Sequence, residues 1–425
     1  MMKFMFMKRK DRERVFLIGI PHFDWKLVKI LFKKGYMKNL KKFLKEGCYG
    51  EIVPQQKECS SPVEFTTIVT GVRKEKHGIG CGKHSDGEYL EGGKMYTRND
   101  IKVKPIWDIA YEAGKRVGVY HWLLTWPAKK IRGFMVTGRD SQDDKRKTYP
   151  KKLRRILWYD FPPEPDFFDP RAAHWLIKKY DVDLFIGMEE RVHGPIHSFW
   201  KYVNSKSKKI AKEKRKFFEL FEYVDTFLKT IEKEFPETNV MIVTDSGLRV
   251  RDEIIYTLGN ETIELSRKLS LDLQFYATDV YPPHLPKAHP TFFLPGKSEK
   301  EKLQIKKILS EIKLENGDNF IKNIKWNGDY LSFQFNFHPK LVDYQNGWLY
   351  LTLPNGEKFK IWVTKQTGVA KPSGGFFAMK GPSIKQGKRI GKVKVEDIAP
   401  TILYLLDIPI PNWMDGSVIK VGLKR

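Results

Sequence analysis

Three groups of polar residues in this chain are of types that could carry nucleophilic or metal-assisted chemistry. Ser61 begins the segment Ser61-Pro62-Val63-Glu64, His193 and His197 stand four residues apart, and Asp245 ends the apolar run 239–245. A serine hydroxyl is a poor nucleophile at neutral pH unless a neighbouring group or a metal ion activates it. Histidine and aspartate are common ligands of divalent metals. These residues predict acids at strand ends and a nucleophile at a helix N-terminus.

The elements that must position these residues are alternating strands and helices. Short, mostly apolar runs with β-branched residues predict strands at 15–19, 116–120, 183–188, 239–245 and 376–379. Between them, amphipathic spacing predicts helices at 27–35, 37–46, 105–113, 170–179 and 196–235. This alternation predicts an α/β fold with a mostly parallel central sheet covered by helices on both faces.

The pattern changes after Asp245. Proline-rich loops surround one predicted helix at 299–312 and strands near 324–326, 330–337 and 348–353, with Asn327-Gly328 as a hairpin turn between two of them. We therefore predict an α+β insertion in the central sheet. The expected domain segments are 1–249 for the first part of the core, 250–365 for the insertion and 366–425 for the last part of the core.

Fragments along the core resemble the type I phosphodiesterase/nucleotide pyrophosphatase family of the alkaline phosphatase superfamily. They stand in the family's order and include 15–25, 60–71, 106–109, 114–119, 124–127, 133–138, 183–186, 197–200, 243–247, 397–403 and 414–416. The resemblance implies an alkaline phosphatase-like fold. It also implies a hydrolase in which a threonine or serine attacks phosphorus while two divalent metals stabilise the attacking and leaving oxygens.

The resemblance also implies which positions would hold those metals. The family's nucleophile falls on Ser61, its aspartate–histidine pair on Asp245 and Ser246, and its helix histidine on His197. Three further ligand positions fall on residues other than the family's own, namely Pro21 for the first-strand aspartate, His193 for a second aspartate and Ala370 for the C-terminal histidine. We therefore expect most metal-ligand positions to be substituted and no resident cofactor.

Two alternatives stay open for this site. In one, the site is vestigial: Ser61-Pro62-Val63-Glu64 is a helix-capping box in which Glu64 reaches back to the cap, and the Glu64 charge repels phosphate. In the other, a remodelled site holds zinc or manganese with Asp245, His197 and His193, and Ser61 attacks. His193 is expected to precede its helix. Substitute ligands would be His22, Glu189 and Glu190, and Asp24 is less well placed.

The net charge of +26 favours a polyanionic partner. A lysine-rich, thermophilic proteome would also explain a high lysine content, but it predicts an equally high glutamate content. In this chain the acidic residues, 51 in number, are fewer than the 77 basic ones. Three basic clusters, at 8–10, 145–155 and 206–216, could form a groove for phosphates and stacked bases together with Tyr149, Trp158 and Tyr159, which lie around the second. Their candidate polyanion-binding residues are Lys145, Arg146, Lys147, Lys151, Lys152, Arg154, Arg155, Lys208 and Lys209.

The three cysteines have no metal-type spacing and predict reduced thiols in a cytoplasmic protein, and no apolar run is long enough to span a membrane. Our leading hypothesis is a catalytically degenerate member of the superfamily whose basic surface binds RNA or an RNA-containing assembly. The first alternative is a metal-dependent phosphodiesterase or nucleotide pyrophosphatase with a remodelled site. The second is a scaffold subunit that docks on an acidic protein.

Overall fold

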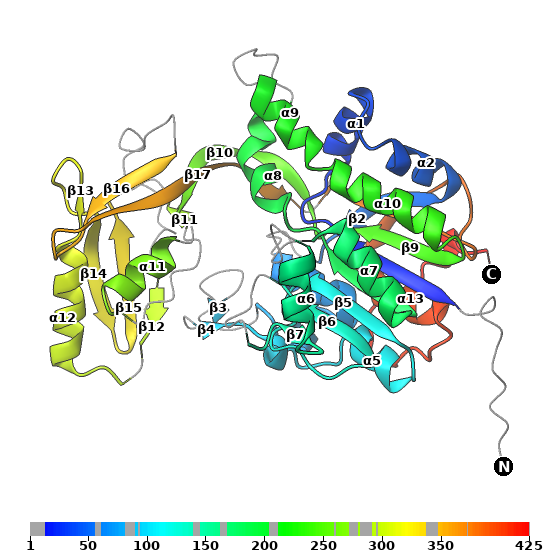
Figure 1. The fold of residues 1–425 in the computed structure, drawn as a ribbon, viewed down its shortest axis with the longest axis horizontal. Helices are drawn as coiled ribbons and strands as arrows, with labels where there is room; N and C mark the ends of the chain where they lie inside the picture. Colours follow the sequence, from blue (N-terminus) through cyan, green and yellow to red (C-terminus); the bar gives the residue numbers. More distant parts are fainter. Residues whose placement is uncertain are drawn as a thin grey trace.

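The computed structural model has two lobes joined by long strands (Figure 1). The larger lobe is formed by the first and last parts of the described chain, and the smaller lobe is formed by its middle part. The structure describes residues 13–55, 61–80, 90–91, 94–138, 145–161, 168–203, 211–258, 261–271, 279–280, 291–294, 296–336, 347–371 and 373–424.

The core lobe is built on one nine-stranded sheet in the order β19-β2-β18-β9-β1-β8-β5-β6-β7. Most neighbouring pairs are parallel, and antiparallel pairs occur where β18 meets β9 and β2 and where β7 meets β6. The α/β fold expected from the sequence is therefore confirmed. The strands are β1 (Arg14–Gly19), β2 (Cys48–Val53), β5 (Val117–Trp122), β6 (Gly133–Thr137), β7 (Thr148–Tyr149), β8 (Leu184–Met188), β9 (Thr238–Val243), β18 (Gly375–Lys380) and β19 (Lys388–Lys394).

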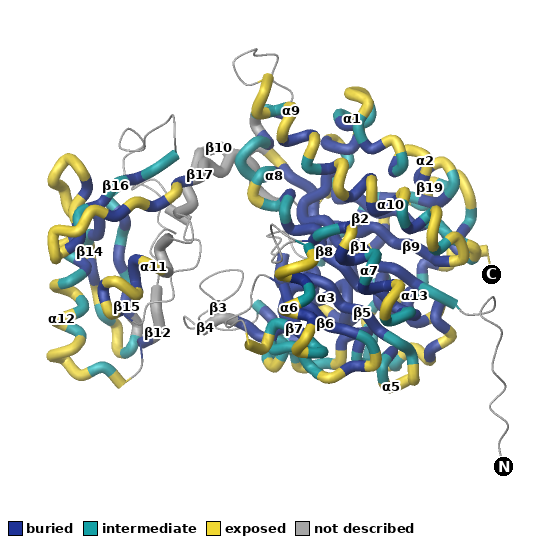
Figure 2. Tube along the Cα trace, in the orientation of Figure 1, coloured by how far each residue is buried: buried dark blue, intermediate teal, exposed yellow. Residues whose placement is uncertain are grey.

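The central strands are apolar throughout because both faces of the sheet are covered. In β1, Val15 and Leu17 belong to one hydrophobic cluster, while Phe16 and Ile18 belong to the cluster on the opposite face. Successive side chains of a strand point to opposite faces, so a continuous apolar run supplies both clusters. Figure 2 shows the resulting buried strands beneath helices that are exposed on their outer side.

Helices pack on both faces. The first face carries α3 (Ser61–Thr70), α5 (Ile106–Glu112) and α13 (Ile398–Leu405), whose apolar residues join the cluster of Val15. The second face carries α1 (Trp25–Lys33), α2 (Lys38–Glu46), α7 (Pro170–Tyr180) and α10 (Glu222–Glu234), whose residues join the cluster of Phe16. Shorter elements of the core lobe are α4 (Lys74–His77), β3 (Leu90–Glu91), β4 (Lys94–Met95) and α6 (Leu153–Asp160).

The prediction of one long helix over 196–235 is wrong. The described residues form α8 (His193–Phe199), α9 (Ala211–Glu219) and α10, with a turn between α9 and α10. The turn lets Phe217 stack on Phe199 at a ring-centroid distance of 5.6 Å while Phe221 stacks on Phe23, also at 5.6 Å. Burial of these aromatic rings against separate partners therefore outweighs the continuity of one helix.

The smaller lobe has its own hydrophobic cluster and two sheets, ordered β11-β10-β17-β16-β13 and β12-β15-β14. The Asn327-Gly328 prediction is confirmed, because this dipeptide starts the turn of the β14–β15 hairpin and Gly328 has φ 60°. The expected boundaries at 249/250 and 365/366 fall inside β10 and β17. The lobe comprises β10 (Gly247–Leu258), α11 (Glu261–Lys268), β11 (Asp279–Val280), β12 (Thr291–Phe293), α12 (Glu299–Ser310), β13 (Lys313–Leu314), β14 (Ile321–Asn327), β15 (Tyr330–Phe335), β16 (Trp348–Thr352) and β17 (Lys358–Lys371).

Candidate active site

The candidate site lies where three neighbouring parallel strands end. Gly19 of β1 is in register with Met188 of β8 on one side and with Val243 of β9 on the other. Residues that follow these strands therefore meet at one edge of the sheet, which is where open α/β sheets place their ligands. His22 follows β1, Glu189 and Glu190 follow β8, and Asp245 follows β9.

A serine–aspartate pair forms at this edge. The Ser61 hydroxyl, at the start of α3, donates a hydrogen bond of 2.6 Å to Asp245 Oδ2, and both side chains are buried. The other oxygen, Asp245 Oδ1, accepts the backbone N–H of His22 at 2.8 Å and the Thr244 hydroxyl at 3.1 Å. These contacts fix the carboxylate, so the serine hydroxyl has a defined acceptor in a site shielded from bulk water.

His22 connects the serine–aspartate pair to the rest of the site. Its Nδ1 lies 2.9 Å from Ser246 Oγ and 3.4 Å from Asp245 Oδ2, while its Nε2 lies 3.3 Å from Ser61 Oγ. The residue has φ 54°, a left-handed conformation that non-glycine residues seldom adopt. The backbone hydrogen bond to Asp245 holds this conformation and aims the imidazole at Ser61.

The capping-box interpretation of Ser61 is wrong. The Ser61 hydroxyl contacts Asp245 and His22, and Glu64 Oε2 instead accepts the backbone N–H of Gln55 at 3.2 Å. Burial raises the pKa of Glu64 to about 8, and the negative charge of Asp245 adds to the rise. Glu64 is therefore neutral at pH 7 and does not repel a phosphate at the start of α3.

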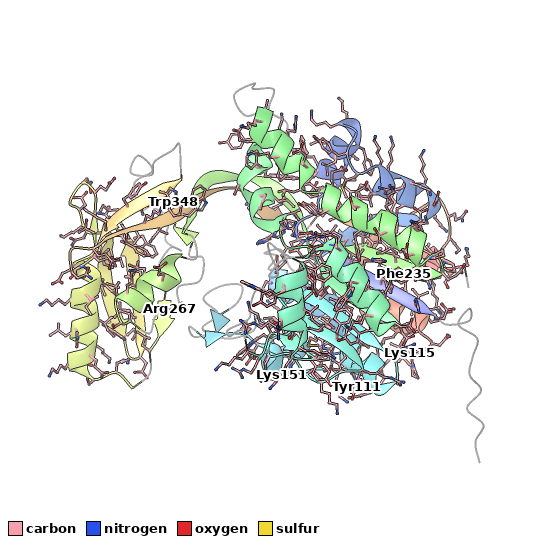
Figure 3. The ribbon with its side chains drawn as sticks, viewed as in Figure 1. Tyr111, Lys115, Lys151, Phe235, Arg267 and Trp348 are labelled. Atoms are coloured by element: carbon pink, nitrogen blue, oxygen red, sulfur yellow. The ribbon has the colours of Figure 1, made fainter. Side chains whose placement is uncertain are left out.

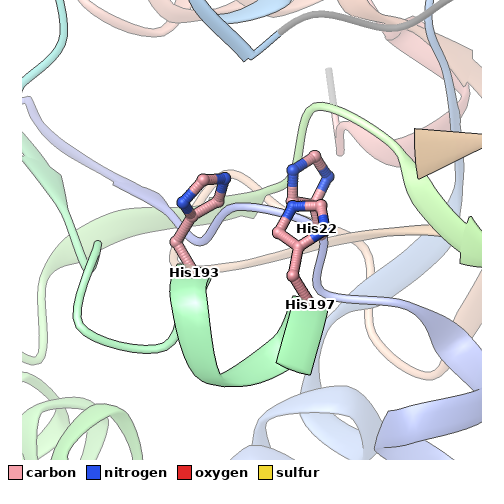
Figure 4. Close-up of side chains that lie close together, drawn as sticks. All are labelled: His22, His193 and His197. Carbon is pink, nitrogen blue, oxygen red and sulfur yellow. The ribbon is translucent and has the colours of Figure 1, made fainter. Parts of the chain in front are cut away.

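His22, His193 and His197 form a histidine cluster in which one nitrogen from each ring lies within 4.8 Å of the others (Figure 4). His193 is the first residue of α8, His197 follows one turn later on the same helix, and His22 approaches from the end of β1. The expectation that His193 precedes its helix is wrong. α8 begins at His193, and Pro195 lies in its first turn, where proline is tolerated because its missing N–H would have no partner in the helix.

The donor set of the histidine cluster fits a divalent metal. Zinc takes three histidine nitrogens at about 2.0–2.1 Å in many catalytic sites and keeps one position for water or substrate. If Nδ1–H of His22 donates to Ser246, the Nε2 lone pair is the one that a metal would use, and a second hydrogen bond of this kind commonly orients a ligating histidine. His22 is thus the member of the cluster that also touches the nucleophile candidate.

Other sequence candidates have different roles. Glu189 is fully buried, its Oε1 accepts the Arg191 N–H at 2.9 Å, and burial raises its pKa to about 8. Neither it nor Glu190 joins the histidine cluster of the described residues. Asp24 caps α1 by accepting the Lys26 N–H at 2.6 Å. Position 21 is a proline in the turn after β1. Ala370, in β17, pairs with Leu248 of β10. Neither proline nor alanine has a side-chain atom that can bind a metal.

One basic cluster from the sequence follows β6, at the same edge of the core sheet. The Arg146 guanidinium lies 4.4 Å from the Trp126 ring centroid, and that of Arg155 lies 5.9 Å from the Tyr159 ring. Tyr159 is 71% exposed. The remaining members on this loop and on α6 are Lys145, Lys147, Lys151, Lys152 and Arg154, and Lys208 and Lys209 lie outside the described residues. Figure 3 labels Lys151 on this part of the core lobe.

Comparisons with known proteins find similar solved structures and one matching family. Murine and human ectonucleotide pyrophosphatase/phosphodiesterase 5 align over 97% of this chain and 100% of theirs, at 13% identity and TM-scores of 0.45 and 0.46. No curated protein matches the sequence, and no helix among the described residues is long and apolar enough to cross a membrane. The sequence model of the type I phosphodiesterase/nucleotide pyrophosphatase family matches residues 15–309, more than half of the chain. The chain therefore belongs to the type I phosphodiesterase/nucleotide pyrophosphatase family.

Proposed function

We propose that this protein is a metal-dependent hydrolase of phosphodiester or pyrophosphate bonds with Ser61 as its nucleophile. The observation that carries the proposal is the buried hydrogen bond of 2.6 Å from Ser61 Oγ to Asp245 Oδ2. A nucleophile held against a positioned acceptor is the arrangement that hydroxyl-based covalent catalysis requires. Membership of a phosphodiesterase family supports the same reaction class.

In the proposed reaction, Ser61 Oγ attacks phosphorus and the bond from phosphorus to the leaving oxygen breaks. Asp245 Oδ2 holds the hydroxyl proton as the new bond forms, and the His22 ring at 3.3 Å limits the directions in which Oγ can turn. Water then attacks the phosphorus of the serine-bound diester and gives up a proton that ends on the oxygen that left. The bond from Ser61 Oγ to phosphorus breaks, and Oγ recovers its proton from Asp245. Because Glu64 is neutral at pH 7, the start of α3 presents backbone N–H groups to the phosphate without an opposing charge.

His22, His193 and His197 are the residues that would hold the metal. A bound zinc or manganese ion would supply charge stabilisation for the attacking or leaving oxygen. The role of the chain is to place three imidazoles together, and Ser246 orients one of them through the 2.9 Å contact with His22 Nδ1. This proposal replaces the vestigial site of our leading sequence hypothesis with a remodelled one.

The test is hydrolysis of a chromogenic phosphodiester by protein loaded with zinc or manganese. We expect Ser61→Ala to lower kcat/KM by at least about 10³-fold, as loss of a covalent nucleophile does, and Ser61→Thr to retain activity. Ser310→Ala, at a half-buried serine at the end of α12, is the matched control and should be unchanged. Equal rates in Ser61→Ala and the unaltered protein would refute the mechanism.

A second candidate function is polyanion binding by the cluster around α6. The exposed Tyr159 ring, with the Arg155 guanidinium 5.9 Å from its centroid, is the observation that favours it, because exposed rings beside further cations can hold both bases and phosphates. RNA is the expected ligand, and an acidic protein would compete for the same surface. Filter binding of RNA at several salt concentrations tests this function. Lys151→Glu with Lys152→Glu should weaken binding and flatten its salt dependence, and unchanged binding would refute it.

A further inference from the structure

The smaller lobe presents an aromatic and basic surface on the β16–β17 hairpin, away from the candidate active site. Along β16 and along residues 358–363 of β17, exposed or half-buried residues alternate with buried ones. The register pairs Trp348 with Trp362, Tyr350 with Lys360 and Thr352 with Lys358. We call these six residues the hairpin face. It therefore combines three aromatic rings and two lysines on one side of a sheet.

Contacts within the hairpin face hold its rings and cations side by side. The Trp348 and Trp362 ring centroids lie 5.1 Å apart with an interplanar angle of 81°. Lys360 Nζ lies 4.4 Å from the Trp348 ring centroid, and Lys358 Nζ donates to Thr352 Oγ1 at 2.8 Å. Trp362 is 41% exposed. A large indole surface thus remains open to solvent beside two ammonium groups.

The opposite side of the same hairpin supplies its contribution to the hydrophobic core, so the residues of the hairpin face are not needed there. Leu349, Leu351, Phe359 and Ile361 are all buried in the hydrophobic cluster of the smaller lobe. Cross-strand aromatic pairs also stabilise hairpins, but this role does not call for lysines among them. Glu357, the acidic residue next to Lys358, pairs instead with Lys268 at 2.6 Å. Within the described part of the chain, no ion pair neutralises Lys358 or Lys360.

We propose that the hairpin face binds single-stranded nucleic acid. Unpaired bases stack on exposed aromatic rings in a sequence-tolerant way, and lysines between the rings hold the phosphates. Exposed rings on the face of a sheet suit the unstacked bases of a single strand, as in RNA-binding modules whose sheet aromatics stack two or three bases. The net charge of +26 attracts such a ligand from a distance.

Single-stranded nucleic acid fits the hairpin face better than an anionic membrane. Trp348 and Tyr350 are half-buried within the pleat, while Lys358 and Lys360 are exposed beside them. A surface that inserts into lipid places its aromatic rings beyond its cations, with apolar side chains buried in the acyl boundary. Figure 3 shows Trp348 on the smaller lobe, whereas Lys151 lies on the core lobe, so this surface is separate from the α6 cluster.

The experiment is fluorescence anisotropy of a labelled 12-mer of oligouridylate, in the Ser61→Ala background so that the probe stays intact. The double variant Lys358→Glu, Lys360→Glu should bind at least about 10-fold more weakly. The matched control is Lys300→Glu, Lys306→Glu, which reverses two exposed lysines on α12 of the same lobe and should change binding less than about 3-fold. Trp362→Ala should weaken binding by about 5- to 150-fold, the range for loss of one stacking ring, and Trp362→Phe should retain most of it.

Three outcomes would overturn the proposal. The control double variant could weaken binding as much as the hairpin-face variant, which would reduce the effect to net charge. Trp362→Ala could bind like the unaltered protein, which would exclude stacking. The unaltered protein could bind phosphatidylserine vesicles and not the oligonucleotide, which would make the ligand a membrane. Hydrolysis of the chromogenic diester by Lys358→Glu, Lys360→Glu with Ser61 intact should be unchanged, so this proposal and that of a Ser61 hydrolase fail independently.

Discussion

The serine–aspartate pair and the histidine cluster share the edge of one sheet but are built differently. The pair is buried, and its aspartate is held by hydrogen bonds from residues that directly follow β1 and β9. The cluster depends on α8, a helix of seven residues, and its His193 is only half-buried. The carboxylate that accepts the Ser61 hydroxyl is therefore held at the strand ends, while two of the three metal-binding groups project from a short helix.

The largest expected effect is the loss of activity when the serine–aspartate pair is changed and the histidine cluster is left intact. Asp245→Asn should lower kcat/KM for the chromogenic diester by about 10²- to 10⁴-fold, the usual range for a group that handles a proton in the transition state. Combining it with Ser61→Ala should cost no more than Ser61→Ala does, because residues that act as a unit are not additive. Steady-state rates of the two single variants and the double variant check this, and a multiplicative loss would show that the two residues act separately.

The cluster should respond to a different change. We expect His197→Ala to weaken zinc binding by at least about 100-fold, more than the 10- to 100-fold typical of an outer-shell partner. His174→Ala, at a half-exposed histidine on α7, is the matched control. Competition with a chromophoric chelator measures both affinities. Asp245→Asn should change zinc affinity less than about 10-fold, and a larger loss would place Asp245 among the metal ligands and remove the distinction between pair and cluster.

Ser246 tests how the two parts are joined. Ser246→Ala removes the oxygen 2.9 Å from His22 Nδ1 and leaves that ring less well oriented. Zinc affinity should fall by about 10- to 100-fold, as it does when the hydrogen-bond partner of a ligating histidine is lost. The same chelator competition measures the change, with Ser310→Ala as control. An unchanged affinity would mean that Asp245 Oδ2, 3.4 Å from Nδ1, orients the ring instead.

The sequence predicted the strands of this site better than its contacts. Apolar runs located β1, β8 and β9 because strands buried on both faces have few alternatives. The partner of Ser61 could not be read in the same way, since Asp245 is 184 positions away and a local capping rule competes with it. The same capping rule led to the wrong prediction that Glu64 reaches back to the cap of α3, whereas it accepts the N–H of Gln55. His22 was recognised as a substitute ligand, but its hydrogen bonds with Ser61, Asp245 and Ser246 depend on a left-handed backbone that no local pattern reveals.

The smallest expected effect concerns the pH dependence of stability beside the pair. Burial raises the pKa of Glu64 from 4.5 to about 8 in the folded state. Its protonated carboxyl therefore contributes stability that is fully present below about pH 4.5 and is lost as the pH rises to about 8, because the unfolded chain releases this proton first.

Glu64→Gln keeps the shape of the side chain and cannot ionise. Between pH 5 and 8, the melting temperature of the unaltered protein should fall by a few °C relative to that of the variant. Glu315→Gln, at an exposed glutamate, should track the unaltered protein. If the melting temperatures of Glu64→Gln and the unaltered protein changed equally between pH 5 and 8, Glu64 would be ionised at pH 7. In that case the start of α3 would repel phosphate, and the serine–aspartate pair would lose the neutral surroundings that distinguish it from the histidine cluster.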